Sequence, residues 1–90
     1  MQTLQFISSQ ISQNKLSEAL IMLDEYILAH PDNADAYFMR GKLHWKLGNR
    51  SAATNDYAVA ADIAPGSAAE AALELAQSIE AFFNPDLLNP

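Results

Sequence analysis

Residues 34–67, ADAYFMRGKLHWKLGNRSAATNDYAVAADIAPGS, decide the fold of this 90-residue chain. Apolar residues recur in this stretch at helical spacing, first over 34–47 and again over 51–64, without sustained period-two alternation. Gly48 separates the two runs and favours a helix end. Pro65 follows the second run, which it cannot continue as helix. The stretch therefore predicts two helices joined by a tight turn.

Similar breakers set the other helices. Asn14 is expected to take a positive φ and end a helix, and Pro31 follows the next helical run. Ser67 and Glu70 have the spacing of a capping box, which predicts the start of the last helix. The expected helices lie near residues 3–13, 16–30, 34–47, 51–64 and 67–83. The predicted fold class is all-α, with about five helices.

An internal repeat relates residues 34–67 to the part of the chain before them. Four pairs of similar residues lie 34 positions apart: Asn14 and Gly48, Ser17 and Ser51, Ala19 and Ala53, and Pro31 and Pro65. A period of this length built from two helices is typical of a helical solenoid. One such unit cannot bury both of its faces, so neighbouring units are expected to stack.

The second unit resembles a tetratricopeptide repeat (TPR). The matching residues are Tyr37, Gly41, His44, Ala53, Tyr57, Ala60 and Pro65. Gly41 and Ala53 are expected to let the paired helices approach closely, with Tyr37 and Tyr57 filling the space around that contact. The unit departs from the family pattern at three positions: Arg40 replaces a leucine, His44 a tyrosine and Arg50 an aromatic residue.

The first unit matches less completely. Leu16, Ala19, Leu23 and Pro31 fit the pattern, whereas Ile7 stands in for the glycine and Tyr26 for a small residue. The resemblance implies one domain over 1–90, with antiparallel helical hairpins stacked as a short right-handed superhelix. Its expected parts are repeat one (about 1–33), repeat two (34–67), a capping helix (68–83) and an apolar tail (84–90).

Composition argues against several classes of function. The net charge of -6 disfavours nonspecific binding to nucleic acid or to anionic membranes. The chain has no cysteine, no histidine pair at metal-ligand spacing and no glycine-rich phosphate loop, so we expect no metal, no cofactor and no enzymatic activity. No secretory signal is visible, and the longest apolar run, 19–23, is too short to cross a bilayer. The expected location is the cytoplasm.

Four of the five cations fall within residues 40–50, around the single tryptophan: Arg40, Lys42, Lys46 and Arg50. Lys42 and Lys46 are one helical turn apart, whereas Arg40 points elsewhere, so the four do not form one nucleic-acid surface. We expect Arg40 to pair with acids of a neighbouring helix, such as Glu70 or Glu74. Arg50 is expected to make a local ion pair, and His44 to belong to the core.

In a TPR stack the first helix of each repeat lines the concave face. The resemblance therefore implies a ligand-binding groove made by Leu4, Ser8, Ile11, Asp35, Phe38, Lys42, Trp45, Lys46, Ala72 and Ile79. An apolar trough with two lysines at its middle suits an extended peptide that carries a carboxylate. Trp45 has two open interpretations: it lines the groove, or it packs between helices. Leu4, Ser8 and Met39 replace polar groups of the chaperone-binding TPR clamp, so no such clamp is predicted.

The predicted function is a protein–protein interaction module, or adaptor, that binds a peptide or a partner helix in its concave groove. The alternative is a self-associating structural module. Its basis is the tail FFNPDLLNP, 82–90, in which Leu87 and Leu88 follow the helix break at Asn84-Pro85. The tail is expected either to fold back over the last helix or to enter the groove of a second copy. In a homodimer of this kind the Pro90 carboxylate would meet Lys42 or Lys46.

Overall fold

The computed structural model describes the backbone of residues 2–83 and the side chains as far as Ile79. Within these residues the chain forms five helices and no strand: α1 (Leu4–Ser12), α2 (Leu16–Ala29), α3 (Ala34–Lys46), α4 (Arg50–Ile63) and α5 (Ala68–Phe83). The predicted all-α class is confirmed, and every helix end lies within one residue of its predicted position. Predictions about Leu87, Leu88 and the rest of 84–90 fall outside the described residues.

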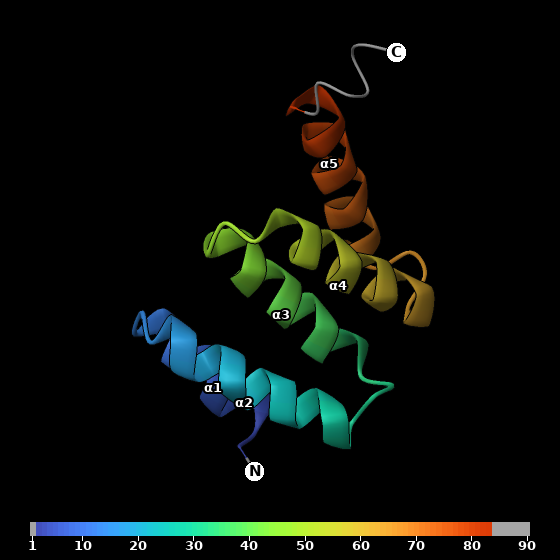
Figure 1. Ribbon diagram of the computed structural model, residues 1–90. Coiled ribbons are helices and arrows are strands. Elements are labelled where there is room, and N and C mark those ends of the chain that lie inside the picture. Colours follow the sequence, from blue (N-terminus) through green and yellow to red (C-terminus); the bar gives the residue numbers. More distant parts are fainter. Residues whose placement is uncertain (1, 84–90) are drawn as a thin grey trace.

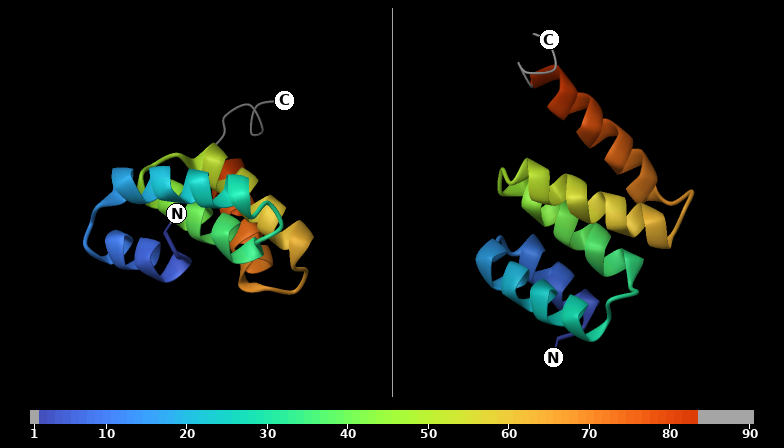
Figure 2. Two further views of the ribbon diagram at one scale, coloured as in Figure 1. Left: turned by 90° about the horizontal axis from the view of Figure 1, so that it is seen from below. Right: turned by 45° about the vertical axis from the view of Figure 1, so that its right-hand side comes forward.

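The helices stack in the order of the chain (Figure 1). Figure 2 shows α1 and α2 as one pair, α3 and α4 as the next, and α5 at the far end. Each helix contacts the one that follows it, and α1 also contacts α3. That last contact places the first helices of the two pairs side by side, as stacked repeats require. None of the described helices is both long and apolar enough to cross a membrane.

Local sequence explains most helix ends. Asn14 has a φ of 63° and Gly48 a φ of 85°, the positive values expected of residues that end helices. The side chains of Thr3 and Asn33 cap α1 and α3, because each accepts a hydrogen bond from the backbone N–H three residues further on. These local features explain where α1 and α3 begin and end.

The start of α5 is capped differently from the prediction. The Glu70 carboxylate accepts a hydrogen bond of 2.7 Å from the Gly66 N–H, one residue before the Ser67 N–H that a capping box uses. Gly66 has a φ of 77°, and the turn that it makes presents its own N–H to the carboxylate. The Ser67 hydroxyl is buried without a hydrogen-bond partner. The predicted helix start was therefore right, and the predicted bonds were wrong.

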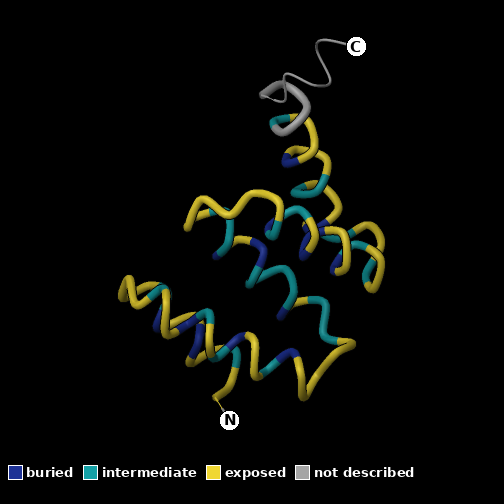
Figure 3. Tube along the Cα trace, in the orientation of Figure 1, coloured by how far each residue is buried: buried dark blue, intermediate teal, exposed yellow. Residues whose placement is uncertain are grey.

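Two clusters of buried residues hold the stack together, on the sides at which the helices face one another (Figure 3). The aliphatic cluster joins α1, α2 and α3 and consists of Ile7, Ala19, Leu23 and Leu43. The aromatic cluster joins α4 and α5 and consists of Ala53, Tyr57 and Ala76, with Phe38 and Trp45 of α3 packed against it. The core therefore runs along the whole stack, and α3 contributes to both clusters.

Gly41 permits a close approach between α3 and α4. A Cβ at this position would lie 2.7 Å from two ring carbons of Tyr57 and 3.3 Å from the carbonyl oxygen of Ala53. Tyr57 is itself buried and cannot swing away without opening the core. The expectation that Gly41 and Ala53 allow close packing is confirmed.

Arg40 pairs with helices other than the one predicted. Its Nε lies 2.8 Å from Oδ2 and its Nη2 2.9 Å from Oδ1 of Asp56 on α4, and its Nη1 lies 3.0 Å from Oδ1 of Asp24 on α2. Hydrogen bonds to the buried Asp56 are the main cause that raises the pKa of Arg40 above its ordinary value. The predicted partners Glu70 and Glu74 belong to α5, whereas Arg40 lies on the side of α3 that faces α2 and α4.

Two other predictions for residues 40–50 have different outcomes. The ion pair predicted for Arg50 is wrong: among the described residues, its guanidinium contacts the ring of Trp45, 5.2 Å from the centroid. His44 is largely buried, and its Nε2 lies 3.9 Å from Oδ2 of Asp56. His44 therefore borders the core beside the Arg40–Asp56 pair, close to its predicted place.

Candidate interaction surface

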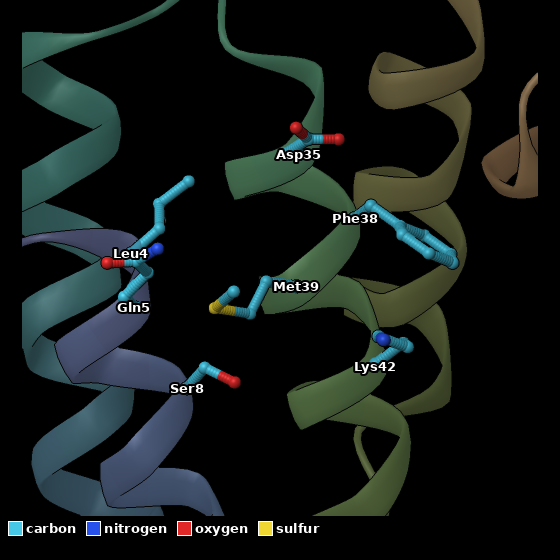
Figure 4. Close-up of a pocket in the computed structure, with 7 residues that line it drawn as sticks. All are labelled: Leu4, Gln5, Ser8, Asp35, Phe38, Met39 and Lys42. Atoms are coloured by element: carbon cyan, nitrogen blue, oxygen red, sulfur yellow. The ribbon is translucent and has the colours of Figure 1, made fainter.

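A hollow lies between α1 and α3 (Figure 4). It has a volume of about 380 Å³ and is lined by Leu4, Gln5, Ser8, Asp35, Phe38, Met39 and Lys42. Met39 points from α3 toward α1, and Ser8 points from α1 toward α3. The ring of Phe38 instead points toward α4, where it lies 5.8 Å from the ring of Tyr57.

A second hollow, of about 170 Å³, continues the first toward the end of α3. Its lining is Ser8, Ile11, Ser12, Met39, Lys42, Leu43 and Lys46. Because Ser8, Met39 and Lys42 line both hollows, the two form one continuous groove, here called the α1–α3 groove. Met39 lies in its floor, and the exposed Lys42 and Lys46 stand one turn apart on its rim.

A separate hollow lies between α3, α4 and α5. This α3–α5 pocket has a volume of about 230 Å³ and is lined by Trp45, Tyr57, Ala72, Leu75, Ala76 and Ile79. Every one of these side chains is largely apolar. Trp45 packs against the aromatic cluster and also lines the pocket, so each of its two interpretations holds in part.

The ten predicted groove residues therefore fall into two places. The α1–α3 groove takes Leu4, Ser8, Ile11, Asp35, Phe38, Lys42 and Lys46, and the α3–α5 pocket takes Trp45, Ala72 and Ile79. The sequence predicted one trough. The structure divides it because Phe38 and Trp45 both pack onto the aromatic cluster between the two hollows.

Several lining residues were missed at the sequence level: Gln5, Ser12, Met39, Leu43, Tyr57 and Leu75. Helical spacing contained the signal for two of them. Asp35, Met39, Lys42 and Lys46 follow one another at intervals of four, three and four residues, which places them on one face of α3. Leu75 lies three residues after Ala72 and four before Ile79, on the corresponding face of α5.

The positive charges around these hollows lack acidic partners within residues 2–79. The Lys42 Nζ lies 4.8 Å from the centroid of the Phe38 ring, and the Arg50 guanidinium lies over Trp45. Lys46 is exposed on the rim, and no described ion pair includes any of these three cations. Arg40, by contrast, is engaged by two aspartates.

The lining of the two hollows can be compared with the side chains that bind metals or transfer protons. Neither the groove nor the pocket is lined by a histidine. Among the described residues, no group of three or more histidine, aspartate or glutamate side chains is placed to hold a metal ion. The pocket presents apolar side chains and rings, and the groove adds two lysines, Asp35 and small polar side chains.

The comparisons with known proteins relate the chain to a bacterial protein. No family model matches the chain, and no curated protein matches it. Among solved structures it is similar to protein BF1650 of Bacteroides fragilis, whose structure in solution was determined by NMR. The two share 32% sequence identity with a TM-score of 0.82, over 99% of this chain and 91% of that chain. At this identity and coverage the chain belongs to the same family as BF1650, and the two share the all-helical fold.

Proposed function

We propose that this chain is a TPR-like interaction module, an adaptor that holds a short peptide or partner helix against its concave face. The assignment to TPR-like repeats is supported by the 34-residue period and by the contact between α1 and α3. The close approach at Gly41 adds support, because the family pattern places a small residue at that position. A short right-handed superhelix is the arrangement that this assignment implies.

The α1–α3 groove is the observation that carries the proposal. Its floor is apolar, through Leu4, Ile11 and Met39, and its rim carries Lys42 and Lys46. An apolar floor binds side chains through burial, and unpaired cations on the rim select and orient a charged ligand. Both properties suit a peptide better than a small metabolite, because the groove is open along its length.

The length of the groove indicates the size of the ligand. An α-helix advances about 1.5 Å per residue, so Asp35 and Lys46 lie about 16 Å apart along α3. An extended peptide advances about 3.3 Å per residue, so about five of its residues span that distance. A ligand of this size is a short linear segment of a larger partner.

Selection from a displayed library of random peptides tests the proposal. The full chain is expected to enrich peptides that bind it, and the Lys42→Ala, Lys46→Ala variant is expected to lose them. Lys15→Ala is the matched control, since Lys15 is exposed in the turn between α1 and α2, away from the groove. Failure to enrich any peptide, or equal capture by the double variant, would contradict the proposal.

The second candidate is a self-associating structural module whose tail packs in its own groove or in that of a partner copy. It is supported by apolar side chains that remain exposed, among them Ile21, Leu28 and Leu75. Self-association would bury part of this surface and support a stack of few repeats. Concentration-dependent sedimentation distinguishes the two candidates. A monomer at all concentrations would exclude the dimer, and dissociation by Leu87→Ser with Leu88→Ser would support it.

A further inference from the structure

The α3–α5 pocket differs from the α1–α3 groove in size and lining, which points to a separate role in recognition. We propose that it takes an aliphatic side chain of a partner peptide, and that Arg50 holds the carboxylate of an aspartate or glutamate next to that side chain. The inference rests on the proposed function and names its ligand chemistry: an acidic residue adjacent to a residue such as leucine.

The shape of the pocket selects one aliphatic side chain. Its volume of about 230 Å³ is below the roughly 300–1,000 Å³ typical of small-molecule sites. Trp45 and Tyr57 contribute rings, and Ala72 and Ala76 keep the base of the pocket open because their side chains are short. A polar side chain inserted there would lose its hydrogen bonds to water, whereas an aliphatic one gains from burial.

Leu75 extends the apolar surface outward from the pocket. It lines the pocket and is 63% exposed. A neighbouring apolar residue of the ligand would therefore find a contact beside the first one. This arrangement favours a second aliphatic residue beside the one that enters the pocket.

Arg50 supplies the charge at the same place. Its guanidinium lies 5.2 Å from the centroid of the Trp45 ring, so it stands beside a residue that lines the pocket. A guanidinium has five N–H donors, and none of those of Arg50 bonds to an acceptor within the described residues. Arg40 shows the contrasting state, in which two aspartates occupy the donors. The open donors of Arg50 match the two oxygens of a carboxylate.

The charges at the two ends of α3 add to the preference for an acidic residue near Arg50. Asp35 lies in the first turn of α3, and Lys46 lies in the last, close in sequence to Arg50. The acidic residue of a peptide lying along α3 is therefore favoured at the Lys46 end and disfavoured at the Asp35 end. The net charge of -6 makes this local concentration of unpaired cations a feature of the site rather than of the whole surface.

Binding of a synthetic peptide to the full chain tests the inference. The probe is Gly-Ser-Asp-Leu-Leu-Ser-Gly, blocked at both ends, and the readouts are calorimetry and the fluorescence of the single tryptophan. Replacing the probe's aspartate with asparagine is expected to weaken binding about tenfold, because a charge-assisted hydrogen bond is lost. Replacing both leucines with alanine is expected to weaken it at least about tenfold, because the buried aliphatic surface is removed.

Variants of the chain assign each effect to its residue. Arg50→Gln is expected to reduce the difference between the aspartate and asparagine probes to less than about twofold while preserving the preference for leucine. Leu75→Ser, at an exposed position, is expected to weaken the preference for leucine alone. Lys15→Gln is the matched control and should change neither preference. Equal binding of the aspartate and asparagine probes by the native chain would overturn the role of Arg50.

The remaining outcomes separate this inference from the proposed function. If the probe does not bind but the displayed library yields peptides that depend on Lys42 and Lys46, the inference fails and the proposed function stands. The chain itself carries Asp86, Leu87 and Leu88 in the order of the probe. If Leu87→Ser with Leu88→Ser makes the full chain bind the probe about tenfold more tightly, the chain's own tail is the occupant and the assignment to a partner is overturned.

Discussion

The helix pairs α1–α2 and α3–α4 combine different residues at two positions that lie 34 residues apart in the sequence. Ile7 and Leu23 of the aliphatic cluster lie 34 positions before Gly41 and Tyr57, which meet between α3 and α4. One repeat combines two side chains of medium size, and the other combines no side chain with a large ring. The Tyr57 ring takes the space that a side chain at position 41 would need, so a glycine at this crossing is required by its partner and not by the repeat.

A second pair of equivalent positions shows the same kind of exchange. Phe6 and Met22 lie 34 positions before Arg40 and Asp56. Two apolar residues, of which Phe6 is 41% exposed, therefore stand in the first repeat where the second has an ion pair. Buried ion pairs are often no more stabilising than apolar residues of similar volume, whereas removing one partner is costly. We therefore expect these two positions to accept either two apolar residues or an ion pair, provided that both residues change together.

The largest expected change in stability comes from giving positions 41 and 57 the residues that the first repeat has at the equivalent positions. Gly41→Ile alone is expected to lower the free energy of unfolding by more than about 3 kcal/mol, because even a Cβ meets the Tyr57 ring. Adding Tyr57→Leu recreates the pair of the first repeat and should recover most of the loss. Urea denaturation followed by circular dichroism measures both changes. A double variant as unstable as the single one would contradict the idea that the residues at positions 41 and 57 compensate for each other.

In the aliphatic cluster, the informative change is the removal of a buried side chain. Leu23→Ala removes a fully buried side chain and should cost about 3 kcal/mol through lost burial and a residual cavity. Leu28→Ala on the same helix is the control, because Leu28 is 84% exposed and should change stability by less than about 0.5 kcal/mol. The same denaturation measurement applies, and equal effects of the two variants would show that the described burial is wrong.

The Arg40 network gives the next largest expected effect. Asp56 is 5% exposed, and Asp56→Ala should cost about 2 kcal/mol, less than for a fully buried pair because Arg40 keeps Asp24 and some solvent. Asp24→Ala should cost less than about 1 kcal/mol, since this aspartate is largely exposed. Arg40→Phe with Asp56→Met, the residues of the first repeat, should return stability to within about 1 kcal/mol of the native chain.

The smallest expected effect is the pH dependence caused by Tyr57. Burial, assisted by the charge of Asp56, raises the pKa of Tyr57 above its ordinary value of 10.0. The native state then retains the phenolic proton at pH values at which the unfolded chain releases it, so stability falls as the pH rises above 10. Tyr57→Phe should flatten this alkaline decline without changing its direction, since other groups also titrate there. An unchanged slope would contradict the assignment.

Features that depend on residues close together in the chain were predicted from the sequence, and features that depend on contacts between helices were not. The turns at Asn14 and Gly48 were predictable because the residue itself favours the required φ. Most residues of the α1–α3 groove were predicted through the TPR resemblance, and helical spacing places three of them, Asp35, Lys42 and Lys46, on one face of α3. The partners of Arg40 and Arg50 were not, since both depend on which faces of α2, α3 and α4 meet.

The sequence by itself determined the five helices, their bounds, the 34-residue period and the small residues at the crossing of α3 and α4. These features depend on backbone preferences and on spacing along one helix, which neighbouring residues in the chain already specify. Only the tertiary structure decided that Asp56 and Asp24 hold Arg40, that Arg50 lies over Trp45, and that the predicted trough is two hollows. Each of these features joins residues of different helices. It therefore depends on which faces of the helices pack against one another, and the order of residues along one helix does not specify that.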